Sequence, residues 1–194
     1  MALTATNLPA VRVVNGAMLP TQTAPYGFTL VTPMLLYIYG NYNVSNSFGS
    51  SLGQNSAIYT WPAALMAGAI TVLSGNWNDG TTSKWPLASD TTINAALLAG
   101  IVPSQSSYNS STGTGYSGGM ENFLRLLKGW GASGDLWYNG SIAAMFPSQY
   151  ATNCWVQTGN YYAAPTRHWA SDANFMDVTK LPPLTPQVVN LVTP

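Results

Sequence analysis

Charged side chains are scarce in this sequence. Lysine, arginine, aspartate and glutamate make up 6% of the 194 residues and the net charge is zero, whereas about 25% is usual in soluble domains. No run of basic residues is present to neutralise phosphates, which argues against nucleic acid as a partner. Hydrophobic residues reach 46%, so the chain has enough apolar surface to fold. An uncharged polar surface favours an extracellular or cell-surface protein.

Cysteine and histidine occur once each. Cys154 has no partner for an internal disulfide, and a lone thiol is most often a small buried hydrophobe. His168 alone does not provide the ligands of a structural zinc site. No stretch reaches the roughly 18 apolar residues of a membrane span, and residues 1–20 are too interrupted by polar residues for a signal peptide. We therefore expect any export signal to lie outside this sequence.

Three apolar stretches, each closing on a glycine, are present. Residues 27–43 (GFTLVTPMLLYIYGNYN) are rich in β-branched and aromatic types, and residues 63–73 and 91–102 follow the same plan. Such runs between glycine and asparagine turns predict strands. Alanine, leucine and methionine within residues 63–73 also suit a buried helix, which is the alternative there. Units recurring at about 20–50 residues predict a stacked architecture.

The predicted fold is therefore mainly β, a short parallel β-solenoid with long decorated loops. Residues 1–26 are expected to form an N-terminal capping segment. Residues 27–194 are expected to form one solenoid domain, with an irregular, aromatic-rich C-terminal part in which residues 187–192 add a final strand. Neutral asparagine, serine and threonine can stack in ladders in such a sheet, where stacked charges would repel.

One amphipathic helix is predicted over residues 119–130. Its apolar residues fall at i, i+3, i+4 and i+7, the spacing of one helix face. An acidic residue lies in the first turn and basic residues lie near the end, as the helix dipole favours. These residues are Met120, Glu121, Phe123, Leu124, Arg125, Leu127 and Lys128.

A nucleophile motif is the first candidate for catalysis. Residues 115–119 (GYSGG) match the pattern G-x-S-x-G, in which a serine needs a histidine base and a carboxylate to orient it. Under this hypothesis Ser117 is the nucleophile, His168 the base, and Asp135 or Asp172 the orienting acid. A chance match in a glycine- and serine-rich loop is the alternative, because the pattern is loose.

Two binding hypotheses remain. Asp172, Asn174 and Asp177 lie close in sequence and could supply oxygens to calcium, although solvated loop acids are the alternative. No other cofactor is indicated. The tryptophans and tyrosines could stack on sugar rings, or they could pack loops onto the sheet.

Several segments together resemble a known family. They include residues 62–79 (PAALMAGAITVLSGNWND), 91–103 (TTINAALLAGIVP), 116–127 (YSGGMENFLRLL) and 138–152 (YNGSIAAMFPSQYAT). They resemble the C-terminal β-helical region of PilX-like or prepilin-type bacterial surface proteins of unknown function. The resemblance implies an exported β-helical domain that follows a longer N-terminal part. It implies no catalytic residues.

Three functions are weighed from the sequence. The first is an exported, non-catalytic solenoid module in cell-surface or pilus-linked assembly and adhesion, with a surface protein or polysaccharide as partner. The second is a small ester or lactone hydrolase that uses Ser117 and His168 or is assisted by calcium. The third is a carbohydrate-binding or carbohydrate-active β-helix.

Overall fold

The computed structural model describes residues 9–20, 27–45, 60–81, 86–102, 123–152 and 162–186. These ranges contain seven strands and two short 3-10 helices. The strands are β1 (Ala10–Val13), β2 (Phe28–Tyr39), β3 (Ala63–Leu73), β4 (Thr91–Ile101), β5 (Leu124–Leu126), β6 (Asp135–Pro147) and β7 (Thr166–Ala170), and the helices are η2 (Ala173–Met176) and η3 (Val178–Lys180). The prediction of a mainly-β chain is confirmed.

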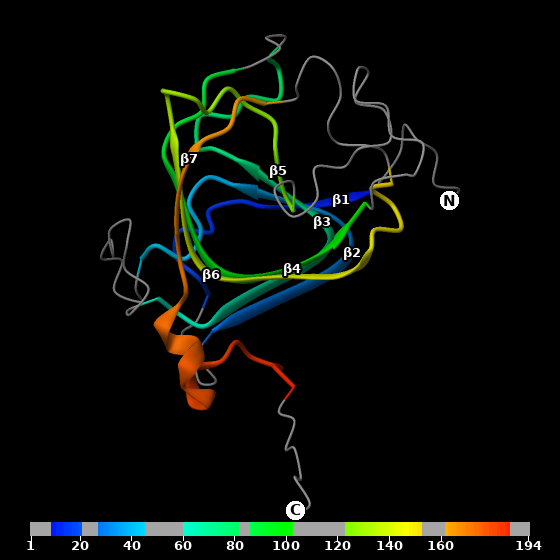
Figure 1. Cartoon of the computed structure of the whole chain (residues 1–194), viewed down its shortest axis with the longest axis vertical. Helices are drawn as coiled ribbons and strands as arrows, with labels where there is room; N and C mark the ends of the chain where they lie inside the picture. Colours follow the sequence, from blue (N-terminus) through cyan, green and yellow to red (C-terminus); the bar gives the residue numbers. More distant parts are fainter. Residues whose placement is uncertain are drawn as a thin grey trace, which may run out of the picture.

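All seven strands belong to one parallel sheet. Its order is β1-β2-β3-β4-β6-β7, and β5 pairs with β3 beyond the stretch that β4 occupies. Parallel neighbours start from the same end, so each connection must return the chain to that end. Such a return usually contains an α-helix, yet the described residues contain none. Figure 1 shows β2, β3, β4 and β6 curving one after another around the same oval interior.

Residues 63–73 form β3, so the helix alternative for them is wrong. Leu65 and Ile70 point into the core, as does Leu97 of β4. On the opposite face of the sheet, Ala64 pairs in register with Ala96. Nearly every position of β3 is buried. Covered faces explain why these strands read as continuous apolar runs rather than as alternating patterns.

Proline interrupts the ladder of β2. The register between β2 and β3 shifts between Thr32 and Leu35, a stretch that contains Pro33. Proline has no N–H to donate to a ladder, so it belongs at such an irregularity. A Cβ at Gly68 of β3 would collide with the Pro33 carbonyl oxygen. The two backbones therefore approach so closely that only glycine fits.

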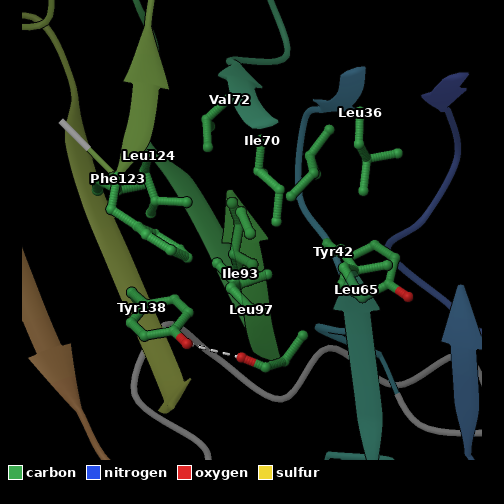
Figure 2. Packing of buried hydrophobic residues seen from close by; sticks show 14 of the residues in the cluster. Leu36, Tyr42, Leu65, Ile70, Val72, Ile93, Leu97, Phe123, Leu124 and Tyr138 are labelled. Atoms are coloured by element: carbon green, nitrogen blue, oxygen red, sulfur yellow. Dashed lines mark hydrogen bonds between the residues drawn. The ribbon is translucent and has the colours of Figure 1, made fainter. Parts of the chain in front are cut away.

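The core is a continuous apolar cluster inside the curved sheet. Figure 2 shows side chains from several strands meeting there, among them Leu36, Leu65, Leu97 and Phe123. Tyr138 also faces this interior, and its hydroxyl can donate to the Ala95 carbonyl at 2.9 Å, drawn as the dashed line in Figure 2. The apolar surroundings raise the pKa of Tyr138 well above its ordinary value because burial disfavours the phenolate.

Three buried asparagines form a hydrogen-bonded ladder that joins the segment after β2 to β4 and β6. Asn43 and Asn94 exchange hydrogen bonds, each donating its side-chain amide to the other's backbone carbonyl at 2.8 and 2.9 Å. Asn139 donates to the Asn94 side-chain oxygen at 2.7 Å. Asn43 has a φ of 57°, a left-handed conformation that asparagine tolerates well. The expectation that neutral polar side chains stack in this sheet is confirmed at Asn94 and Asn139, which pair in register on β4 and β6.

The helix predicted over residues 119–130 is wrong in its described part. Leu124, Arg125 and Leu126 form β5 and pair with Ile70, Thr71 and Val72 of β3. All three β5 residues are buried, so a short strand here does not need an alternating pattern. Burial and pairing with β3 outweigh the local helical spacing. Residues 119–122 lie outside the described ranges.

An Asn-Gly pair such as Asn139-Gly140 favours a tight turn, but no turn forms there. Both residues lie within β6, which continues to Pro147. A Cβ at Gly140 would overlap the Ala95 carbonyl oxygen of β4. The glycine therefore serves close strand contact rather than chain reversal.

Within the described ranges, no helix has both the length and the apolar character needed to cross a membrane.

Candidate functional site

His168 and Asp135 lie side by side at the edge formed by β6 and β7. Trp137 of β6 pairs in register with His168 of β7. Asp135 lies two residues before Trp137, and alternate residues of a strand share a face. His168 Nε2 is 2.9 Å from Asp135 Oδ2, and the two side chains are 34% and 38% exposed. The contact between His168 and Asp135 that the hydrolase hypothesis requires is therefore present.

The imidazole of His168 is also held by stacking. Its ring lies 3.8 Å from the Trp137 ring, centroid to centroid, at an interplanar angle of 11°. The Asp135 backbone N–H donates to Asp90 Oδ1 at 2.9 Å. A histidine that donates Nε2–H to a carboxylate keeps Nδ1 free to accept a proton. The pair could therefore act as a base towards a hydroxyl or water on its solvent side.

Of the other members of the proposed catalytic set, only Asp172 lies within the described residues. Ser117 lies outside the described residues. Asp172 is turned away: its carboxylate accepts from the Asn174 backbone N–H at 2.9 Å and from the Thr60 hydroxyl at 3.4 Å. Burial raises the pKa of Asp172 above its ordinary value. Asp135, and not Asp172, is therefore the candidate partner of His168.

Two of the three residues suggested for calcium serve the local backbone instead. Asp172 caps η2 and Asp177 caps η3. Asp177 accepts from both the backbone N–H and the hydroxyl of Thr179, and these bonds lower its pKa. Within the described ranges, no group of three or more histidine, cysteine, aspartate or glutamate side chains gathers as a metal site. Calcium binding stays a hypothesis without a ligand cluster to support it.

A buried lysine is a feature that the sequence did not reveal. Lys128 is fully buried, and its ammonium donates to Ser74 and to the Asn76 side-chain oxygen. The Trp77 ring centroid lies 5.8 Å from Lys128 Nζ. Burial lowers the pKa of Lys128 to about 8, because desolvation disfavours the ammonium. Ser74 and Lys128 are more than 50 residues apart, so local sequence spacing gives no signal for their contact.

This serine–lysine contact resembles the nucleophile and base of some hydrolytic sites. Both side chains have 0% exposure, however. A substrate could not reach the serine without displacing the surrounding structure. We interpret the cluster as a structural polar network that joins the turn after β3 to the segment after β5.

An open strand edge and a groove lie where β7 ends. β7 pairs with β6 only over residues 135–139, and no described strand pairs with that side of residues 140–147. Met145 and Phe146 within this stretch are 59% and 45% exposed. A groove of about 430 Å³ lies beside the start of this edge, lined by Tyr138, Gly140, Ser141, Ile142, Trp169, Ala170 and Ser171. This edge could accept an extended chain whose side chain enters the groove.

One exposed ion pair ties the first strand to a loop. Arg12 of β1 donates two hydrogen bonds to the Asp79 carboxylate, at 2.8 and 2.9 Å. The Arg12 guanidinium, helped by the Trp77 N–H, lowers the pKa of Asp79 to about 2. This pair lies at the opposite end of the sheet from β7.

Comparison with protein-family models, with curated proteins and with solved structures found no match to this chain.

Proposed function

We propose that this chain is an exported module for cell-surface or pilus-linked assembly and adhesion, whose contact surface is the open edge of β6. The observation that supports this most strongly is the exposed apolar strand edge at the β6–β7 end of the sheet. Parallel strands that pair in chain order, without α-helical crossovers among the described residues, also fit a short solenoid. In a solenoid, the end coils present backbone groups to a neighbouring molecule.

The chemistry of the edge supports protein contact. Residues 141–147 (SIAAMFP) contain no charged side chain. Exposed edges in proteins that must stay apart are usually blunted by lysine, by inward charges or by a covering element. Here Pro147 is the one residue of this kind, and it lies at the far end of β6. An apolar edge that no described strand covers is what a strand-accepting surface requires.

The experiment places one charge on this edge. In cells that encode the protein, Met145→Lys should reduce its recovery in the surface fraction by at least about fivefold, because a charge is costly at a desolvated contact. Met176→Lys is the matched control, since Met176 of η2 is 90% exposed and lies outside β6. Surface labelling followed by quantitative immunoblotting gives the readout. Equal recovery of both variants and the native protein would contradict the proposal.

A hydrolase is the second candidate, favoured by the contact between His168 and Asp135. The pair supplies a base and its orienting carboxylate, while Ser117 remains the candidate nucleophile. Hydrolysis of a nitrophenyl ester and of an acyl lactone tests this function. His168→Ala, Asp135→Asn and Ser117→Ala should each abolish turnover if it is correct. If turnover is lost only when a chelator is added, the calcium-assisted hydrolase is supported. Absence of turnover by the native chain would contradict both the serine-based and the calcium-assisted hydrolase.

Carbohydrate binding is the third candidate and has one specific support. Trp169 is 47% exposed and borders the groove beside the β6 edge. An exposed indole face can stack on the apolar face of a sugar. Retarded migration of the native chain in polysaccharide gels, abolished by Trp169→Ala, would support it. Unchanged migration of the native chain would oppose it.

A further inference from the structure

Each end of the sheet has a stretch of strand that its outermost strand leaves uncovered. At one end, β1 pairs with β2 only over residues 35–38, and no described strand pairs with that side of residues 28–34. At the other end, β7 pairs with β6 only over residues 135–139, and the open edge over residues 140–147 follows. Both ends of the sheet are therefore stepped.

The register of the sheet brings these two open stretches onto the same rows. Residues 29–32 of β2 pair with residues 64–67 of β3, which pair with residues 96–99 of β4, and these pair with residues 141–144 of β6. Every one of these pairings is parallel. A second copy that is moved along the rows, without being turned over, would therefore place its residues 29–32 beside residues 141–144 of the first copy. The new pairing would be parallel, as all the others are.

The apolar core also stops at these two steps. One row consists of Leu30, Leu65, Leu97 and Ile142. Leu65 and Leu97 are fully buried in the core, whereas Leu30 and Ile142 pack against it and are only partly buried. In the stacked arrangement, Ile142 of one copy would lie beside Leu30 of the next. The row of core side chains would then continue from one copy into the other, and both ends would gain apolar burial.

The chemistry of the two stretches permits this pairing. Residues 29–32 (TLVT) and 141–144 (SIAA) contain no charged side chain, so no charge has to lose its water at the contact. Pro33 and Pro147, which cannot donate to a ladder, lie outside both stretches. The backbone N–H and C=O groups on the open sides can therefore pair without interruption over these rows.

We propose that the partner of the β6 edge is a second copy of this chain, which adds residues 29–32 of its β2 to residues 141–144 of β6. The contact is head-to-tail, because each copy uses one end of its sheet for the copy before it and the other end for the copy after it. Repetition of such a contact builds a row of copies. The inference rests on the proposed function of the edge, since it names the partner that this edge accepts.

Disulfide trapping between two separately made variants tests this contact. Both variants carry Cys154→Ser, and one adds Val31→Cys while the other adds Ala143→Cys. Val31 is 67% exposed, and it shares a row with Ala143. Neighbouring strands lie about 4.8 Å apart, which is within the Cα separation of a disulfide. After mild oxidation of the mixture, a two-chain product should appear on a non-reducing gel.

Two further variants control for accidental contact and for register. Met176→Cys is exposed on η2, and its mixture with Val31→Cys should give at least roughly fivefold less product, because its thiol is not held beside a partner thiol. Ser141→Cys lies on the same face as Ala143 but two residues earlier. Its Cα would be about 7–8 Å from that of residue 31 in the next copy, so it should also give less product than Ala143→Cys.

The outcomes separate this inference from the assembly function itself. Equal yields from Ala143→Cys and Met176→Cys would overturn the second-copy contact, and equal yields from Ala143→Cys and Ser141→Cys would overturn its register. If Val31→Cys alone gives as much product as the mixture, like ends meet and the head-to-tail contact is wrong. Absence of product together with reduced surface recovery of Met145→Lys would overturn the second copy as partner while supporting assembly with a different protein.

Discussion

At the scale of single residues, buried asparagines pair in register where β4 and β6 meet, at Asn94 and Asn139. Asn94 lies at the centre of the ladder, since it bonds both the Asn43 backbone and the Asn139 side chain. A buried amide that loses its partner costs more than the bond itself contributes. The ladder therefore favours one register over the slipped alternatives that apolar side chains alone would tolerate.

Asn94→Ala is expected to lower the free energy of unfolding by about 2–3 kcal/mol, because it removes the buried side-chain hydrogen bonds from Asn94 to the Asn43 carbonyl and from the Asn139 amide to Asn94. Chemical denaturation of the native and variant chains measures this loss. Asn78→Ala is the control, since Asn78 is exposed and its side-chain oxygen accepts from the nearby Gly80 N–H. A loss for Asn94→Ala no larger than that of the control would show that the ladder contributes little.

The buried Lys128 is expected to make the stability of the folded chain depend on pH. Its folded pKa of about 8 lies below the ordinary 10.5, so the unfolded chain binds more protons between these pH values and stability rises with pH there. Relative to Lys128→Met, the native chain should gain about 2 kcal/mol of unfolding free energy from about pH 7.5 to about pH 9.5. Denaturation at the two pH values tests this. Exposed Lys180→Met should reproduce the native dependence, and a native chain as insensitive to pH as Lys128→Met would refute it.

At the scale of elements, close approach between strands explains what local patterns could not. The apolar runs and their glycine turns predict β2, β3 and β4 well, because strand formation there follows from β-branched and apolar content. Helical spacing around Leu124 misleads, because β5 is defined by burial and by its pairing with β3. The Asn139-Gly140 pair has turn chemistry, but the Ala95 carbonyl beside Gly140 is visible only in three dimensions.

Gly140→Ala is expected to lower the free energy of unfolding by more than about 3 kcal/mol, because β4 and β6 must separate to admit a methyl group. Gly75→Ala is the matched control, since its added Cβ would meet only the Ser89 hydroxyl, at 3.9 Å. Thermal unfolding of both variants provides the comparison. Similar midpoints for the two variants would mean that the sheet relaxes easily at Gly140.

The candidate site was predictable only in part, because contacts between strands do not show in the local sequence. With a single histidine in the chain, the sequence identifies His168, but two acids were equal candidates to orient it. The parallel register of β6 and β7 brings Asp135 to His168, while the cap of η2 holds Asp172 elsewhere. The open edge of β6 has no sequence signal at all, because it depends on β7 ending at Ala170.

At the scale of the whole molecule, the proposed assembly function depends on the end of the sheet that β6 and β7 form. Apart from β5, the strands follow one another in chain order to this end, where a buried core gives way to exposed apolar side chains on β6. An assembly module needs such a surface, whereas an enzyme needs the base at His168 to meet a nucleophile. The proposed assembly function therefore requires that another protein contacts residues 141–147 in the cell.

Site-specific photo-cross-linking tests that claim most directly. A benzophenone side chain is placed at position 145 on the β6 edge or, as the control, at exposed position 176 on η2, in cells that encode the protein. The account predicts cross-linked species of higher mass from position 145 and none from position 176. The absence of intermolecular products from position 145, or equal products from both positions, would contradict it.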